Sequence, residues 1–242
     1  MRRVRLSWLA GLALTCLLIS ACGAELPSDV HVDSLELSTK EVTLTELQDA
    51  FAGNALTPPL YEQSTGTRLY GVVIPFDIGW LPEGVQYQIV RVNLILLKDV
   101  GGSSYPENEE VRVVTPIPFS VERTSDKTVS TKWAASITGT IEALSGTLSG
   151  ESTSSESYEK IYRSVTAHVT SHHEISWEFT PFLDEPIPGG LHYVVAVVEV
   201  PDGSTGNLFY ASAGCYYAAD AMVGDGNGNG CVVGTTQEVY IP

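Results

Sequence analysis

Apolar and polar residues alternate along much of this chain, most regularly in its middle third. Between residues 129 and 143, and again between 161 and 179, odd-numbered positions are mainly apolar and even-numbered positions mainly polar. A period of two is typical of a β-strand with one buried face. We therefore expect two long antiparallel strands of one sheet, with these side chains in the core: Trp133, Ile137, Ile141, Val165, Val169 and Trp177.

Shorter apolar runs, separated by turn residues, predict further strands. Residues 85–97 become continuously apolar, as a central strand would, and the run 69–78 contains Pro75, which favours an edge strand or a bulge. One helix is expected to begin at Thr45, with Gln48 three residues later as in a capping box. The predicted fold class is all-β, an antiparallel β-sandwich with unusually long amphipathic strands and at most one short helix.

The N-terminal residues have the pattern of an export signal. Three arginines precede the apolar run 6–19, which is too short to span a bilayer, and the run ends in Ile19-Ser20-Ala21-Cys22. This ending resembles the lipobox of bacterial lipoproteins. The resemblance implies that Cys22 is acylated and becomes the first residue of the mature protein. The alternatives are an ordinary secretory signal cut near Ala21 or Ala24, and a plain membrane anchor.

The expected organisation has three parts. Residues 1–21 are a lipoprotein signal peptide, residues 22–33 are the lipidated N-terminus and a tether, and residues 34–242 are the β-sandwich domain. The domain carries a flexible insert at 144–160, rich in Ser, Thr and Gly. Two acyl chains hold a protein stably on a membrane. We therefore expect an exported protein whose membrane partner is reached through the lipid on Cys22, in the cell membrane or an outer membrane.

The cysteines predict one disulfide. Cys16 would leave with the signal peptide and Cys22 would carry lipid, so Cys215 and Cys231 remain. In an oxidising compartment, a bond between them is the default expectation. The alternative, a two-cysteine metal site, lacks neighbouring histidines.

The charge of the chain excludes some partners. It carries 13 basic and 29 acidic side chains, a net charge of −16. Residues 1–21 hold three of the basic side chains and none of the acidic ones, so their removal would leave −19. Such a surface repels nucleic acid and anionic lipid headgroups. We expect no nucleic-acid partner, and a protein or glycan ligand instead.

The sequence carries no catalytic constellation. His173-Glu174 begins an H-E-x-x-H pattern, but its fifth position is Trp177, and the segment is predicted to be a strand. His168 and His172 would lie about 13 Å apart on one strand face, too far for one metal. His172 and Glu174 could share an ion with help from a neighbouring strand, and histidines on a polar face are the alternative. We expect no cofactor.

One segment resembles the opening of a calcium loop. Asp225, Asn227, Asn229 and Gly230 fit the D-x-N-x-N-G pattern, but position 12 is Thr236 and not Glu. The flanks are predicted to be strand and coil. A Gly-rich loop bounded by the disulfide is the alternative to a calcium site.

Three classes of function fit this chain. The first is a non-catalytic, lipid-anchored envelope protein that serves as a binding or structural module. The second is a pore-former, because residues 120–190 have a composition similar to that of aerolysin-type proteins, with two long amphipathic strands flanking a Ser/Thr-rich insert. The third is an enzyme acting on envelope glycans, with carboxylates that only the fold brings together.

The lipobox resemblance predicts that Cys22 is acylated. Mass spectrometry of the mature N-terminus should find the lipid adduct on this cysteine. Cys22→Ser should release the protein into the soluble fraction, because no acyl chain then holds it on the membrane. An unmodified mature N-terminus at another residue would contradict the prediction.

Overall fold

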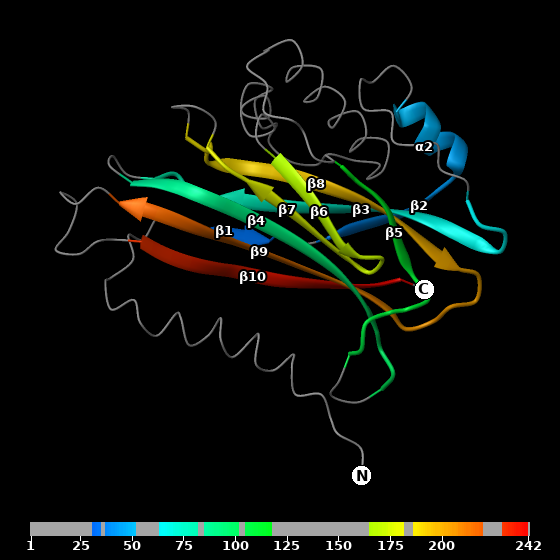
Figure 1. Ribbon diagram of the computed structural model, residues 1–242. Helices are drawn as coiled ribbons and strands as arrows, with labels where there is room; N and C mark the ends of the chain where they lie inside the picture. The colour runs from blue at the N-terminus through cyan, green and yellow to red at the C-terminus, as the bar shows by residue number, and fades with distance from the viewer. Residues whose placement is uncertain are drawn as a thin grey trace.

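The computed structural model describes residues 31–34, 37–51, 63–81, 85–101, 105–117, 165–181, 186–219 and 229–241. Within these ranges the chain forms two antiparallel sheets packed face to face, with a single short helix (Figure 1). The predicted all-β antiparallel sandwich is therefore confirmed. No helix in the described ranges is long and apolar enough to cross a membrane.

Each sheet contains five of the described strands. The first sheet has the order β1-β3-β8-β5, with β2 also paired to β3: β1 is Val32–Ser34, β2 Ser38–Val42, β3 Thr67–Ile78, β8 Gly190–Pro201 and β5 Arg112–Ile117. The second sheet has the order β10-β9-β4-β7-β6: β10 is Asn229–Ile241, β9 Asn207–Ala219, β4 Val85–Lys98, β7 Glu174–Phe179 and β6 Val165–Ser171. The helix, α2, is Leu44–Phe51. β1 includes Val32 and Asp33, which were expected to belong to the tether.

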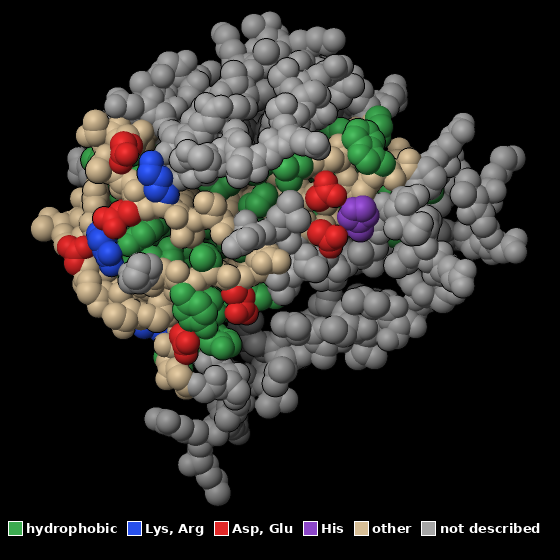
Figure 2. Space-filling model, turned by 180° about the vertical axis from the view of Figure 1, so that it is seen from behind, with side chains coloured by type: hydrophobic (Ala, Val, Ile, Leu, Met, Phe, Trp, Pro, Cys, Tyr) green, Lys and Arg blue, Asp and Glu red, His purple; other side chains and the backbone are tan. Residues whose placement is uncertain are grey.

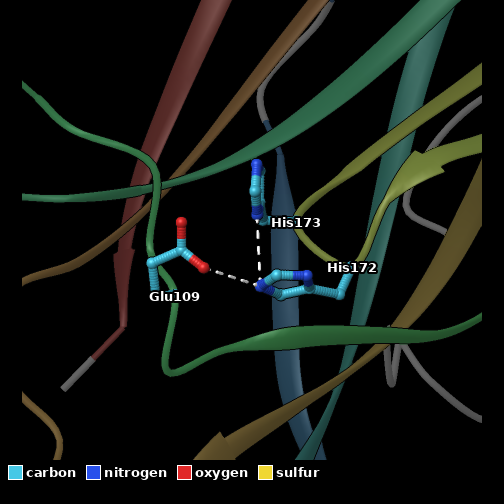
Figure 3. Close-up of side chains that lie close together, drawn as sticks. All are labelled: Glu109, His172 and His173. Carbon is cyan, nitrogen blue, oxygen red and sulfur yellow. Dashed lines mark hydrogen bonds and ion pairs between the residues drawn. The ribbon is translucent and has the colours of Figure 1, made fainter.

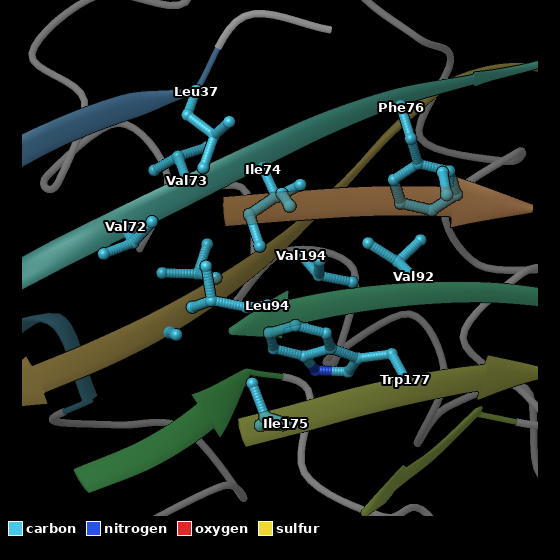
Figure 4. Packing of buried hydrophobic residues seen from close by; sticks show 14 of the residues in the cluster. Leu37, Val72, Val73, Ile74, Phe76, Val92, Leu94, Ile175, Trp177 and Val194 are labelled. Carbon is cyan, nitrogen blue, oxygen red and sulfur yellow. The ribbon is translucent and has the colours of Figure 1, made fainter. Parts of the chain in front are cut away.

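The hydrophobic core lies between the two sheets. Side chains from β3 and β8 meet side chains from β4 and β7, as Figure 4 shows. In β4, Val90, Val92, Leu94 and Leu96 are fully buried, whereas their neighbours in sequence are more exposed. This period of two places one face of β4 in the core, as the apolar run 85–97 predicted for a central strand.

The segment 161–179 is not one long strand. Residues 165–179 form the hairpin of β6 and β7, which turns at His172 and His173. In its register Val165 pairs with Phe179 and Ala167 with Trp177, so odd positions face odd positions. Next to the two-residue turn Ser171 pairs with Glu174, and the β-bulge between Val169 and Ser171 then brings odd positions opposite odd positions, which leaves the alternation in phase. The pattern of apolar residues cannot distinguish such a hairpin from a continuous strand.

Of the core residues expected in this segment, two are buried and one is exposed. Val165 and Trp177 are fully buried, but Val169 is 51% exposed. Val169 lies on β6, the outermost strand of the second sheet in the described part of the chain, next to the bulge between Val169 and Ser171. The expected strand 129–143, with Trp133, Ile137 and Ile141, lies outside the described residues, as does the insert 144–160.

Pro75 does not mark an edge strand. β3 pairs with β8 along its whole length, and on its other side it pairs with both β1 and β2. The partners of β2 end at Val73 and those of β1 begin at Phe76. Pro75 thus lies in the gap between two short strands, where the ladder on that side requires no N–H donor.

The helix begins slightly earlier than predicted. Thr43 Oγ1 accepts a hydrogen bond from the Glu46 N–H at 3.1 Å, and Glu46 Oε2 accepts one from the Thr43 N–H at 2.7 Å. This reciprocal pair is the capping box, so the expected pair of Thr45 and Gln48 is wrong by two residues. The hydrogen bond from Thr43 lowers the pKa of Glu46 from its ordinary value.

A buried carboxylate joins three elements of the first sheet. Glu199 of β8 is 3% exposed. Its Oε1 accepts hydrogen bonds from the Ser64 N–H at 2.8 Å and from the Thr67 hydroxyl at 2.6 Å, and its Oε2 pairs with Arg112 Nε of β5. The ionised carboxylate thereby receives donors on both oxygens, which offsets its loss of hydration.

We expect Arg112→Met to lower the free energy of unfolding by about 3 kcal/mol, because it leaves the buried Glu199 without its cationic partner. Arg91→Met is the matched control, since Arg91 pairs with the more exposed Glu178 at 2.6 Å. Loss of that surface pair should cost less than about 1 kcal/mol. Urea denaturation measures the free energy of unfolding of both variants. An equal loss in the two would contradict the role assigned to Glu199.

A second buried polar side chain, His192 of β8, is sensitive to pH. Its ring is fully buried, donates from Nε2 to the Pro188 carbonyl at 3.1 Å and lies 5.7 Å from the Phe76 ring. Burial lowers the pKa of His192 to about 4, although the Pro188 carbonyl and Asp77 oppose the shift. The folded protein therefore holds this imidazole in its neutral form.

Because the unfolded His192 titrates near pH 6.5, the unfolded chain binds a proton between pH 6.5 and 4 that the folded chain does not. Stability contributed by this group is complete above pH 6.5 and is lost as the pH falls towards 4. We expect His192→Phe to reduce the loss of unfolding free energy between pH 7 and 4.5 by about 2 to 3 kcal/mol. His168→Ala, at an exposed histidine, should leave that loss unchanged.

Candidate functional site

The candidate site lies at one rim of the sandwich, where the connection from β4 to β5 folds back along β4. Glu107 forms a bridge opposite Leu97, and the Asn108 N–H donates to the Leu96 carbonyl at 3.0 Å. The Asn108 side chain is buried and donates to Asn207 Oδ1 at 2.8 Å. These contacts fix the backbone on both sides of Glu107 and Glu109.

The turn of the β6–β7 hairpin meets this connection and joins the two sheets. The His172 carbonyl accepts a hydrogen bond from the Val113 N–H of β5 at 2.6 Å, and the His173 carbonyl accepts one from the Leu96 N–H of β4 at 2.8 Å. β5 belongs to the first sheet and β4 to the second. The two histidines are thus held in place by both layers of the fold.

Two carboxylates and two imidazoles converge at this point. His172 Nε2 lies 3.2 Å from Glu109 Oε2 and 3.4 Å from His173 Nδ1, and His173 Nε2 lies 2.5 Å from Glu107 Oε2. In Figure 3 one nitrogen of the His172 ring points toward both the Glu109 carboxylate and the His173 ring. The two rings meet edge to face, with an interplanar angle of 83°. His173 is buried, whereas His172 and Glu109 are exposed.

A pocket of about 600 Å³ lies beside this cluster and shares Glu107 and Glu109 with it. We call it the tyrosine pocket; its other lining residues are Ile95, Leu97, Tyr105, Pro106 and Tyr210. Ile95 and Leu97 come from β4 and Tyr210 from β9, and Ile95 is directly opposite Tyr210 in the ladder. The pocket therefore rests on the outer face of the second sheet.

Tyr240 of β10 adds a phenol next to this pocket. Desolvation, with a hydrogen bond to Tyr105 and the nearby acidic groups Asp99 and Glu238, raises the pKa of Tyr240 above its ordinary value. Its hydroxyl accordingly stays protonated and can act as a donor. Figure 2 shows one face of the molecule, on which acidic side chains lie among apolar ones.

The residues predicted for lipid attachment and calcium binding lie mostly outside the described part of the chain. Cys22, Asp225 and Asn227 lie outside the described residues, and Asn229 is the first residue of β10. β9 ends at Ala219 and β10 begins at Asn229, so positions 5 to 12 of the expected calcium loop lie in a strand. The lipid attachment and the calcium site stay predictions.

The two remaining cysteines lie on neighbouring strands. Cys215 of β9 is opposite Val232, and Cys231 of β10 is opposite Tyr216, so the cysteines are one position out of register. Cys215 is buried, and the described part of the chain contains no disulfide. The bond between Cys215 and Cys231 stays a prediction.

Only the histidines of the cluster could be predicted from the sequence. The sequence suggested an ion shared by His172 and Glu174 with a ligand from a neighbouring strand. In the structure the carboxylates are instead Glu107 and Glu109 of the β4–β5 connection. These glutamates lie in a polar segment between residues 101 and 110 that gave no sign of a site. Neither Glu174 nor His168 belongs to the cluster.

Comparison with known proteins gives weak likenesses. No protein-family model and no curated protein matches the sequence. Among solved structures, the collagen-binding subdomain of the Enterococcus faecalis surface protein ACE is 7% identical with a TM-score of 0.29, over 75% of this chain and 92% of that one. The Clostridium perfringens NetB toxin in its membrane-inserted form is 6% identical with a TM-score of 0.34, over 86% and 94%.

A backbone pilin of Streptococcus pyogenes, T6 of serotype M6, is 12% identical with a TM-score of 0.32, over 84% of this chain and 34% of the pilin. Surface-protein domains and pore-forming toxins therefore both occur among the neighbours. At such identities and TM-scores these likenesses carry no conclusion about function.

Proposed function

We propose that this protein is a non-catalytic, lipid-anchored module of the cell envelope, and that it binds a glycan in the tyrosine pocket. The observation that carries the proposal is the pocket itself. Its volume of about 600 Å³ is within the usual range for small-ligand sites, and apolar and aromatic side chains form most of its wall. Flat tyrosine rings can stack on a sugar ring, while phenol and carboxylate oxygens bind its hydroxyl groups.

The arrangement of the carboxylates favours binding over catalysis. A glycoside hydrolase uses two carboxyl groups that face each other across the scissile bond. Here Glu107 contacts His173 and Glu109 contacts His172, so each carboxylate already has an imidazole partner. The two carboxylates of the pocket thus contact imidazoles and offer polar contacts at its rim.

The charge of the chain limits the class of glycan. With a net charge of −16, the protein repels polyanions. A neutral or amine-bearing sugar is therefore the expected ligand, and glycans rich in phosphate or uronic acid are not. Acidic side chains around the pocket would additionally attract an amino sugar.

Lipidation at Cys22 would place the pocket close to the membrane. Only about ten residues separate Cys22 from Val32, where β1 begins, and a chain of that length reaches at most about 36 Å. The sandwich would then stand next to the envelope glycans. This placement rests on the lipobox resemblance.

The pore-forming alternative depended on two long amphipathic strands. Of these, 129–143 lies outside the described residues, and residues 165–179 form a hairpin of two short strands. A membrane-spanning strand needs about 9 to 11 residues, whereas β6 has 7 and β7 has 6. The described part of the chain therefore favours a binding module.

A glycan array probed with the full-length chain tests the proposal. We expect binding to neutral or amine-bearing oligosaccharides, and titration calorimetry should show that Tyr210→Ala weakens the best of them at least about tenfold, or about 1.4 kcal/mol. Tyr216→Ala is the matched control, because Tyr216 is an exposed tyrosine of the same strand outside the pocket. Its affinity should equal that of the unmodified protein.

Chromatography of the bound oligosaccharide should show no cleavage products. Cleavage would overturn the non-catalytic role and favour a glycan-acting enzyme. Absence of glycan binding, or equal binding by Tyr210→Ala, would overturn the role of the pocket. Binding to protein segments alone would replace the glycan by a protein ligand.

A further inference from the structure

We infer that Glu109, His172 and His173 form a zinc-binding site. One ligand atom of each residue, a ring nitrogen or a carboxylate oxygen, lies within 4.8 Å of those of the other two. Two imidazole nitrogens and one carboxylate oxygen suit Zn²⁺ better than Ca²⁺ or Mg²⁺, which prefer oxygen ligands alone. This inference does not rest on the proposed glycan binding.

The spacing of these atoms fits a tetrahedral ion. With zinc–ligand bonds of about 2.0–2.1 Å, two ligands at the tetrahedral angle lie about 3.3–3.4 Å apart. His172 Nε2 is 3.2 Å from Glu109 Oε2 and 3.4 Å from His173 Nδ1. Two of the three edges of the coordination polyhedron are therefore already present. A small rotation of the exposed Glu109 side chain can set the third.

Glu107 gives His173 the tautomer that the site needs. His173 Nε2 lies 2.5 Å from Glu107 Oε2, so the ring donates its proton there and presents the lone pair of Nδ1 to His172 and Glu109. A carboxylate that holds the second nitrogen of a metal-binding histidine is a recurring feature of zinc sites. Glu107 thus acts as a positioning residue.

The contacts of His172 Nε2 also fit a bound cation. Without a metal, Nε2 of His172 faces two acceptors, Glu109 Oε2 and His173 Nδ1, and carries at most one proton for both. A metal ion at this point would satisfy all three atoms at once, with the His172 proton moved to Nδ1.

The backbone holds these ligands before any ion binds. The carbonyls of His172 and His173 accept hydrogen bonds from β5 and β4, one from each sheet, and Asn108 fixes the chain between Glu107 and Glu109. Such preorganisation lowers the entropic cost of binding. Three protein ligands leave a fourth position for water or for a donor atom of a bound ligand. Since Glu109 also lines the tyrosine pocket, the ion would lie at the rim of that pocket.

Titration calorimetry with ZnCl₂ tests the site, on full-length protein that carries a tag without histidines and has been treated with chelator. We expect one Zn²⁺ per chain at this site. His172→Ala and Glu109→Ala should each weaken binding at least about tenfold, because one of three ligands is lost. His168→Ala, on the same hairpin but outside the cluster, is the matched control and should bind as the unmodified chain does.

Two further readouts separate a zinc site from a structural cluster. Co²⁺ in place of Zn²⁺ should give the visible absorption bands of a four-coordinate ion, and these should disappear in Glu109→Ala. Glu107→Gln should lower the affinity about 10- to 100-fold without abolishing the bands, as expected for a positioning residue. Tyr210→Ala should keep its zinc affinity, so a failure of glycan binding and a failure of this inference remain distinguishable.

The inference is overturned if the unmodified chain binds no Zn²⁺ up to millimolar concentration, or if Glu109→Ala binds as tightly as the unmodified chain. Glu109 is exposed, so its substitution leaves the fold intact even if His172→Ala does not fold. Equal loss of binding in His168→Ala would also overturn the assignment, because it would place the ion elsewhere on the hairpin.

Discussion

The packing of one sheet against the other is the constraint on which the rest of this structure depends. β3 and β8 face β4 and β7 across a continuous apolar layer, with Trp177 as its largest fully buried side chain. Burial of apolar surface is the main favourable term in folding. A polar group that lies next to this layer therefore needs hydrogen-bond partners. Glu199 and His192 lie within the first sheet because neighbouring groups hydrogen-bond to them.

The same packing positions the candidate site. A sandwich exposes its rims, and there the loops from both sheets come together. In this protein the β6–β7 turn bonds to β5 on one side and to β4 on the other, so its two histidines move with the sheets and not as a free loop. The segment around Asn108 is fixed by a buried amide pair with Asn207. A rigid scaffold thereby holds four titratable side chains within contact distance.

The tyrosine pocket and the histidine cluster share two residues and supply complementary chemistry. The pocket offers apolar and aromatic surface, and the cluster offers nitrogen and oxygen ligands at its edge. An ion bound there would have an open position next to a cavity of small-ligand size. The two sites can nevertheless be separated, because Tyr210 belongs only to the pocket and His172 only to the cluster.

Local patterns in the sequence determined the fold class. The apolar run 85–97 predicted a strand whatever its neighbours, whereas the face of β4 that lies in the core is seen from the period of two in its burial. Placement of the elements was decided by tertiary structure. The alternation in 161–179 fits a continuous strand and a hairpin equally. Pro75 predicted an edge strand or a bulge, because nothing local shows that it lies at a gap between β1 and β2.

In the candidate site, too, the sequence and the tertiary structure determine different things. His172 and His173 are adjacent in the sequence, and on the continuous strand predicted for 161–179 adjacent side chains would point to opposite faces. Only the turn brings both rings to one point. Glu107 and Glu109 stand more than 60 residues away in the chain, and nothing local predicts that contact. The sequence by itself determined which segments are strands with an apolar face, because that depends on the local pattern of hydrophobic residues, but not the burial of every residue, as Val169 and Glu199 show. The tertiary structure decided which polar groups meet, because long-range contacts depend on how strands are ordered in the sheets.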